Sequence, residues 1–189
     1  MSTNLEIESK SMLSKNDYEK LISIFGSGKI YEQINYYIDT KSCELIKRKC
    51  GLRIRILNDK NEFTLKVPNN EGKLEINQQI SDKQVENTIQ TNIIPDGEIK
   101  DYLITVLNAK IDDLKVLGKL TTKRLDLYYN GSLISIDESN YNGLTDYEIE
   151  AEDNSMKKAE SNLKQLLKEN EIEFKQSRLN KIERFIESL

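Results

Sequence analysis

Charged side chains alternate with apolar ones along several short segments, the spacing at which a β-strand places them on one face. The acidic positions of this kind are Glu6, Glu8, Asp137, Glu148 and Glu150. The basic positions are Lys10, Arg53, Arg55, Lys66 and Arg124, and Lys181 lies in a further charged segment near the C-terminus. Exposed faces usually mix the two signs, whereas these segments gather like charges. We therefore expect the charged faces to meet inside the protein, around a bound cation and a bound polyanion.

The residue types indicate which ions these are. Carboxylates supply only oxygen ligands, which suit Mg²⁺ or Mn²⁺ rather than zinc. Arginine binds phosphate in a bidentate manner, and lysine binds it as a point charge. The five carboxylates carry −5 and the six cations +6. Roughly two Mg²⁺ ions and a triphosphate of about −5 would therefore bring the total close to neutrality.

The chain contains no histidine, which excludes a histidine general base and any histidine-based triad. A hydrolase of this composition would activate water through a metal ion held by carboxylates. For any single strand, an ordinary sheet with a solvent-exposed charged face also explains the alternation. Its recurrence across many strands favours a site for a metal ion and a polyanion.

Length and composition limit the class of protein. The 189 residues fit one domain, residues 1–189. The net charge of −4 argues against a nucleic-acid-binding protein, which needs a broad basic face. No apolar run reaches membrane-spanning length, and the N-terminus does not resemble a signal peptide. Cys43 and Cys50 match no zinc spacing, so we expect two reduced thiols in a soluble cytoplasmic protein with no nucleic-acid or membrane partner. The sequence makes no prediction of the oligomeric state.

Periodicity predicts an α+β protein whose strands alternate in polarity. The expected strands are Leu5–Ser11, Tyr31–Asp39, Leu52–Leu57, Glu62–Val67, Leu74–Ile80, Leu120–Tyr129, Ser132–Asp137 and Tyr147–Ala151. The expected helices run from Ser14 to Gly26, over Ser81–Gln90 and Glu98–Ala109, and over about Ser155–Asn170 and Leu179–Ser188. Hairpin turns are expected at Asn58-Asp59-Lys60-Asn61, Asn69-Asn70-Glu71-Gly72 and Asn130-Gly131.

Taken together, the charged segments resemble a known family. The opening Leu5-Glu6-Ile7-Glu8-Ser9-Lys10 matches the ExExK signature of the CYTH superfamily, also called the triphosphate tunnel metalloenzymes. The segments that follow in the family's order are Leu52-Arg53-Ile54-Arg55, Thr64-Leu65-Lys66, Gly72-Lys73-Leu74-Glu75, Leu117-Gly118-Lys119-Leu120-Thr121-Thr122-Lys123-Arg124, Ser135-Ile136-Asp137, Asp146-Tyr147-Glu148-Ile149-Glu150 and Asn180-Lys181-Ile182-Glu183-Arg184-Phe185. The resemblance covers nearly the whole chain and is greatest with the bacterial branch found in Firmicutes.

This resemblance implies a closed eight-stranded antiparallel β-barrel, or tunnel, with peripheral helices. The metal ligands it implies, for one or two Mg²⁺ or Mn²⁺ ions, are Glu6, Glu8, Asp137, Glu148 and Glu150. The triphosphate-binding residues it implies are Lys10, Arg53, Arg55, Lys66, Arg124 and Lys181. The alternative to phosphate binding by Lys181 is that its side chain lies exposed on the surface of a helix. Glu75 matches an acidic position of the family to which we assign no role.

The expected activity is hydrolysis of a linear triphosphate, with Lys10, Glu148 and Glu150 in the catalytic roles. Inorganic tripolyphosphate is favoured over nucleoside or thiamine triphosphate, because no base-recognition pocket is evident from the sequence. One alternative is adenylate cyclase, which forms cyclic AMP from ATP. A purine pocket for ATP would have to be formed by aromatic residues, and the candidates are Tyr36, Tyr37, Tyr128 and Tyr129. A non-catalytic module that binds polyphosphate or nucleotide is a further alternative.

Overall fold

The computed structural model describes residues 2–26, 28, 30–58, 60–177 and 179–189. The strands within them are β1 Ser2–Glu6, β2 Glu8–Leu13, β3 Ile30–Thr40, β4 Gly51–Leu57, β5 Lys60–Pro68, β6 Lys73–Ile80, β7 Leu114–Tyr129, β8 Ser132–Tyr141 and β9 Leu144–Glu152. The helices are α1 Lys15–Phe25, α2 Glu44–Lys47, α3 Asp82–Thr91, α4 Glu98–Thr105, the 3₁₀ helix η1 Ile111–Asp113, α5 Met156–Glu169 and α6 Lys181–Glu187. Asp59, expected in a hairpin turn, lies outside the described residues. The predicted α+β class is confirmed.

The chain forms two compact units. The first comprises Met1–Leu5 and Ile34–Leu120, and the second comprises Glu6–Gln33 and Thr121–Leu189. Strands β1, β3 and β7 therefore supply residues to both units, and each unit has its own hydrophobic core. That residues 1–189 act as one domain stays a prediction.

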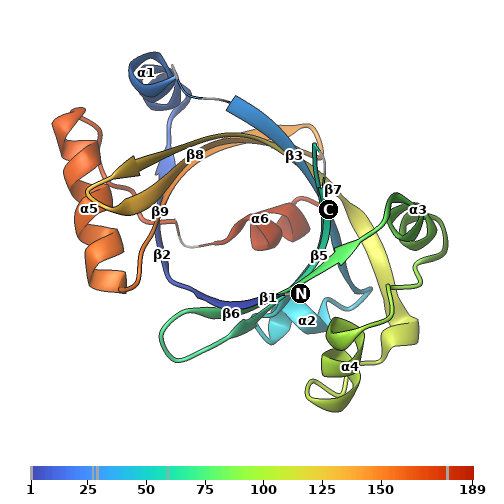
Figure 1. Cartoon of the computed structure of the whole chain (residues 1–189). Coiled ribbons are helices and arrows are strands. Elements are labelled where there is room, and N and C mark those ends of the chain that lie inside the picture. Colours follow the sequence, from blue (N-terminus) through green and yellow to red (C-terminus); the bar gives the residue numbers. More distant parts are fainter. Residues whose placement is uncertain (1, 27, 29, 59, 178) are drawn as a thin grey trace. The chain divides into compact units, whose positions relative to one another are not determined.

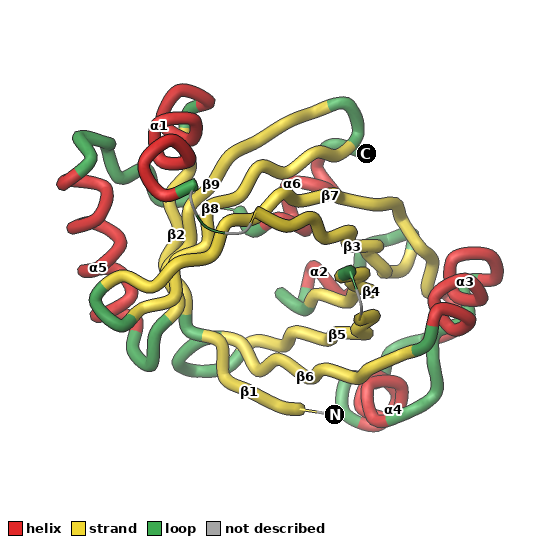
Figure 2. The backbone as a smooth tube through the Cα atoms, turned by 45° about the horizontal axis from the view of Figure 1, so that its top comes forward, coloured by secondary structure: helices red, strands yellow, loops and turns green. Residues whose placement is uncertain are grey.

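In the second unit, β7, β8, β9 and β2 pair in that order, and the pairs β7–β8, β8–β9 and β9–β2 are antiparallel. Helices α1 and α5 lie on one side of these strands, and α6 lies on the other (Figures 1 and 2). Leu125, Ile136 and Ile149 are fully buried in one core with Leu21 of α1 and Leu163 of α5. The intervening residues of the strands face the opposite side, toward α6.

The first unit uses its strands in the same way. Strands β4, β5 and β6 are antiparallel neighbours. Leu52, Phe63 and Ile76 belong to a core that also contains Val85 of α3 and Ile99 of α4. The alternate residues of β4 and β5, on the face opposite the core, include the cations expected in a site.

Three helices begin with a capping box, which explains where they start. The side chains of Ser14, Ser81 and Asn180 each accept a hydrogen bond from the backbone N–H three residues further on. The side chain of that later residue in turn accepts a hydrogen bond from the backbone N–H of the capping residue. The helix expected to begin at Ser14 is confirmed, with Ser14 as its cap. The turn at Asn130 and Gly131 also forms as expected, because both residues have the positive φ of a type I′ turn, 50° and 84°.

The closed eight-stranded barrel is not what the structure describes. The expected strand Leu5–Ser11 is interrupted at Ile7, so the described part of the chain has nine strands. The hydrogen-bonded order is β1-β6-β5-β4-β3-β7-β8-β9-β2, and within the described residues β1 and β2 form its two ends. Ile7 is buried, and its carbonyl accepts a hydrogen bond at 3.1 Å from the backbone N–H of Asp153, beyond the end of β9. This contact accounts for the interruption.

One short helix, α2, was not expected. Its first N–H groups are satisfied by the buried carboxylate of Asp39, which accepts hydrogen bonds from the backbone of Leu45 at 2.9 Å and of Ile46 at 3.0 Å. Asp39 thus caps a helix, and no further role is needed to explain its burial. Among the described helices, none has the length and apolar character needed to span a membrane.

Candidate functional site

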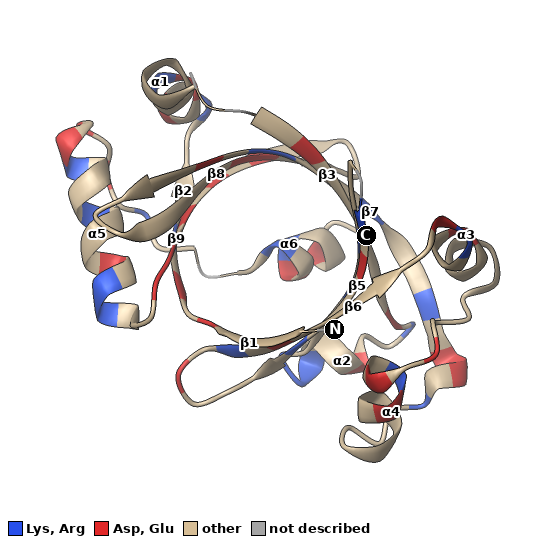
Figure 3. Ribbon diagram, in the orientation of Figure 1, with Lys and Arg blue, Asp and Glu red and all other residues tan. Residues whose placement is uncertain are grey.

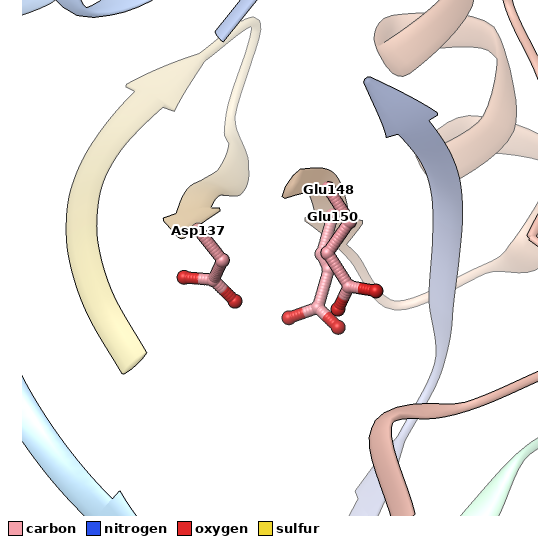
Figure 4. A group of neighbouring side chains, drawn as sticks. All are labelled: Asp137, Glu148 and Glu150. Carbon is pink, nitrogen blue, oxygen red and sulfur yellow. The ribbon is translucent and has the colours of Figure 1, made fainter. Parts of the chain in front are cut away.

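Three carboxylates gather on the α6 side of the second unit. Asp137 on β8 and Glu148 and Glu150 on β9 each bring one oxygen within 4.8 Å of the other two. Their side chains point toward one another (Figure 4). Strand pairing explains the arrangement, since Asp137 and Glu148 are directly opposite in the register. Asp137 and Glu148 are fully buried, and Glu150 is 8% exposed. We call these residues the acidic triad.

Two of the expected cations contact the acidic triad from neighbouring strands. Arg124 lies opposite Asp137 and donates to its two oxygens at 2.7 and 2.6 Å. The same guanidinium donates to Glu150 at 2.7 Å. Lys10 lies opposite Glu150 and contacts it at 3.1 Å, and it contacts Glu8 at 2.6 Å. The triad therefore lies in a network of ion pairs that crosses four strands.

A third cation comes from α6, where acidic and basic residues stand side by side (Figure 3). Lys181 Nζ lies 2.8 Å from Asp137 and 3.1 Å from Glu150. It also forms a hydrogen bond with Glu148. Lys181 thus contacts every member of the acidic triad, and its expected contact with phosphate stays a prediction.

Burial and charge together fix the ionisation of this network. Burial raises the pKa of Asp137, but the attraction of Arg124 and Lys181 outweighs this effect and holds that pKa well below its usual range. Burial likewise disfavours the charged form of Lys10, yet the attraction of Glu150 raises the Lys10 pKa above its ordinary value. Both groups therefore stay charged at neutral pH, as ligands for a metal ion and a polyanion must.

Arg184 on α6 is a residue of this network that the sequence analysis did not select. Its Nη2 donates to Glu148 at 2.5 Å, and its Nε donates to Asp146 at 2.8 Å. Asp146 also accepts a hydrogen bond from the Tyr141 hydroxyl at 2.6 Å. The sequence pattern could have indicated Asp146, because it precedes Glu148 and Glu150 at alternate positions of β9 and so shares their face of the strand. Arg184 stands on a helix, where spacing alone does not tell which side meets the sheet.

The expected cations of the first unit form a second cluster. Arg53 on β4 and Lys66 on β5 contact the same oxygen of Glu75 at 3.4 and 3.3 Å. Arg55 donates to Asn35 at 3.0 Å. The Nε of Arg53 is buried and has no hydrogen-bond partner within the described ranges. An unpaired buried donor is costly, so an acceptor supplied by a ligand would stabilise the folded chain here.

Glu75, to which the family pattern gave no clear role, balances these cations. Burial raises the pKa of Glu75, but the attraction of Lys66 and Arg53 outweighs it and lowers that pKa to about 2. The carboxylate is therefore ionised at neutral pH and offsets one positive charge. Its other oxygen accepts a hydrogen bond from Asn4 at 3.2 Å.

Two of the expected acidic ligands lie outside the acidic triad. Glu6 is partly buried at the end of β1. Glu8 begins β2 and joins the network through Lys10. Their role as metal ligands stays a prediction, as does phosphate binding by the basic residues.

The acidic triad fits a hard divalent cation. It offers oxygen atoms only, which Mg²⁺ and Mn²⁺ prefer. Two ligand oxygens on opposite sides of Mg²⁺ lie about 4 Å apart. Oxygens that already lie within 4.8 Å of one another need little movement to reach that spacing.

Known proteins match this chain along nearly its whole length. The model of the CYTH domain matches residues 4–186. YjbK of Bacillus subtilis (strain 168), whose name describes a candidate triphosphatase, is 34% identical over 189 residues, which are 99% of this chain and 97% of YjbK. The crystal structure of a candidate adenylate cyclase from Bacillus halodurans has a TM-score of 0.91 at 35% identity, covering 98% of this chain and 99% of the other. HpAC1 from Hippeastrum, a candidate adenylyl cyclase reported with a dominant triphosphatase activity, has a TM-score of 0.83 at 23% identity, covering 97% and 96%, and shares the fold.

Proposed function

Because the chain belongs to the CYTH family, we propose that it is a divalent-metal-dependent phosphohydrolase that cleaves a linear triphosphate. Inorganic tripolyphosphate is its preferred substrate in this proposal, with nucleoside and thiamine triphosphates as the other members of the class. The name of the relative YjbK supports triphosphate hydrolysis.

The acidic triad is the observation that carries the proposal. Three buried carboxylates are costly to fold unless cations neutralise them. Arg124 and Lys10, which contact the triad, are groups of the kind that bind phosphate oxygens. Acidic ligands beside phosphate-binding donors support a complex of metal ion and polyphosphate better than either ligand alone.

The chain's own residues have separate roles in this reaction. Asp137, Glu148 and Glu150 hold the metal ion, which when bound supplies Lewis-acid activation of water and of the phosphate group. Lys10 and Arg124 orient the triphosphate and stabilise the negative charge that develops on the leaving pyrophosphate. Glu148 or Glu150 accepts a proton from the attacking water.

The first unit has phosphate-binding groups of its own in this proposal. The unpaired Nε of Arg53 supports its role as a donor to phosphate. We assign the same role to Arg55 and Lys66, whose positions match the family pattern.

Phosphate release tests the proposed function. The purified protein should release phosphate from inorganic tripolyphosphate with Mg²⁺ or Mn²⁺, and EDTA should stop the reaction. Glu150→Gln should lower the rate by at least about 100-fold, because it weakens the metal site. Glu138→Gln is the matched control, since Glu138 follows Asp137 on the opposite face of β8 and pairs with Lys123 at 3.4 Å. Absence of phosphate release from every linear triphosphate with either metal would overturn the proposal.

Adenylate cyclase is the second candidate, because the relative from Bacillus halodurans carries that name. Cyclisation uses the same contacts to metal and triphosphate, but the nucleophile is the ribose 3′-hydroxyl of ATP rather than water. Product analysis with ATP separates the two activities: cyclic AMP and pyrophosphate indicate a cyclase, whereas ADP and phosphate indicate a hydrolase. Binding of tripolyphosphate without turnover would indicate a non-catalytic module.

A further inference from the structure

Two cations of α6 contact the acidic triad, and they are held in different ways. Lys181 and Arg184 lie about one turn apart on this helix. Within the described residues, the ion pairs of Lys181 all go to the triad, and its side chain is only 11% exposed. The triad attracts the Lys181 ammonium, but burial outweighs the attraction of Asp137 and lowers the pKa of Lys181 to about 7. The ammonium of Lys181 is therefore held less firmly than that of Lys10, whose pKa is raised.

Arg184 is held mainly by groups outside the triad. Besides Glu148, its guanidinium donates to the two oxygens of Asp146 at 2.8 and 3.4 Å. It also donates to the Ser177 hydroxyl at 3.3 Å and to the Leu179 carbonyl at 2.9 Å. These contacts use all five N–H donors of a guanidinium. Arg184 can therefore stay in place, and keep Glu148 oriented, when the occupant of the triad changes.

Charge favours an exchange at Lys181. The ion-paired residues of the network are the carboxylates Glu8, Asp137, Asp146, Glu148 and Glu150 and the cations Lys10, Arg124, Lys181 and Arg184. With Lys181 protonated, five carboxylates and four cations leave a formal charge of −1. A divalent ion added to this network would give +1, whereas a divalent ion in place of Lys181 gives zero. Because a buried net charge is costly, replacement is favoured over addition.

We propose that Lys181 is an internal counter-ion that occupies the acidic triad until a divalent metal ion replaces it, and that Arg184 is a positioning residue that keeps Glu148 oriented in both states. This inference rests on the proposed metal-dependent function. A compact ammonium on a flexible four-carbon stem can leave without displacing the helix, which a guanidinium held by a fixed fork of bonds cannot do. The displaced ammonium is then available for the phosphate contact that the family resemblance implies.

Mn²⁺ binding in phosphate-free buffer, measured by isothermal titration calorimetry, tests this inference without an activity assay. Lys181→Met removes the competing cation and keeps the side-chain length, so Mn²⁺ should bind more tightly by about tenfold or more. Arg184→Met removes the group that orients a metal ligand, so Mn²⁺ should bind about 10- to 100-fold more weakly. Lys123→Met is the matched control and should bind Mn²⁺ as wild type does, because Lys123 is half exposed and pairs with Glu138 instead.

The opposite signs of the two effects are decisive. If both cations acted only by repelling the metal ion, both variants would bind Mn²⁺ more tightly, and the positioning role of Arg184 would be wrong. Arg184→Lys, which keeps the charge and loses the fork, should still weaken binding, and unchanged binding would contradict that role as well.

The proposed replacement of Lys181 by a metal ion is tested separately from the role of Arg184. If Lys181→Met binds Mn²⁺ no more tightly than wild type, Lys181 is not a competitor and the exchange is overturned. If neither protein binds Mn²⁺, the proposed metal-dependent function fails together with the inference. Thermal melting without metal checks that each variant folds, and Lys181→Gln, with the same expected result, replaces Lys181→Met if that variant does not fold.

Discussion

Each of the two charged clusters contains residues of the opposite charge from its own unit. Glu75 contacts Arg53 and Lys66 in the first unit, and Lys181 contacts the acidic triad in the second. Like charges that are buried together without such partners would destabilise the folded chain. These internal counter-ions let each unit fold before a ligand binds, and a ligand of the same sign must then compete with them.

Glu75→Gln should change how stability depends on pH. Burial raises the pKa of Glu75, but Lys66 and Arg53 lower it from an ordinary value of 4.5 to about 2. A folded-state pKa below the unfolded one stabilises the protein above about pH 4.5, and this stabilisation is lost as the pH falls toward about 2. The lowering corresponds to about 3 kcal/mol at neutral pH. Urea unfolding of both proteins should therefore show a difference that is largest at neutral pH and disappears at the acid end.

Glu71→Gln is the control for this experiment, because Glu71 is exposed in the turn before β6. Its unfolding free energy should follow that of wild type across the pH range. If Glu75→Gln lost the same stability at acid and neutral pH, the loss would come from packing and not from charge.

The strand residues of the network could be predicted from alternation. Of its helix residues, Lys181 was expected only from the family resemblance, and Arg184 was not expected. Alternation assigns Arg124, Asp137 and Glu150 to the face opposite the apolar side chains of their strands. Helix α6 reads Lys-Ile-Glu-Arg-Phe-Ile-Glu, and several of its charged residues could face the sheet. The side that does so depends on how the buried residues of α6 dock, which is a tertiary property.

At the level of elements, α6 is positioned by its cap and by one aromatic contact. Asn180 accepts a hydrogen bond from the backbone N–H of Glu183 at 3.0 Å, and its own N–H donates to the Glu183 side chain at 2.7 Å. Phe185 is fully buried, and its ring centroid lies 6.2 Å from that of Tyr141. A helix of seven residues is too short to be stable alone. The cap and the docking contacts therefore hold its two cations over the sheet.

Asn180→Ala should lower stability and activity together, whereas Ser81→Ala should lower stability alone. Each change removes the side-chain cap of a capping box, which contributes about 1 kcal/mol. Helix α3, capped by Ser81, packs on the core of the first unit and carries no residue of the proposed site. Urea unfolding should show similar losses for the two variants, and phosphate release from tripolyphosphate should fall only for Asn180→Ala. Equal activity in both would show that α6 does not position groups for the reaction.

Strand boundaries depended on contacts that alternation does not reveal. Ile7 continues the alternation of its neighbours, so the sequence predicts one strand where the bond from Asp153 produces two. Strand β7 begins at Leu114 and not at Leu120, because the adjacent apolar residues Val116 and Leu117 obscure the alternation there.

On the scale of the whole chain, both units use one face of their strands for a core and the other for charge. This division explains an apolar fraction of only 37% beside a charged fraction of 32%, since each strand needs a single apolar face. The two cores contain different residues and are packed by different helices, α3 and α4 in the first unit and α1 and α5 in the second. Units with separate cores can open separately.

Mg²⁺ should therefore slow amide hydrogen exchange in the second unit and leave the first unit unchanged. A ligand at about 100 times its Kd stabilises the state that binds it by about 2.7 kcal/mol. Amides that exchange only when that unit opens should therefore exchange about 100-fold more slowly. The amides to follow are those of β8 and β9, with those of α3 and α4 as the internal reference. Asp137→Asn, which loses a ligand of the acidic triad, should abolish most of the protection. Equal protection of α3 and α4 in wild type would show that the two units unfold together, and protection of neither unit would show that Mg²⁺ does not bind the triad.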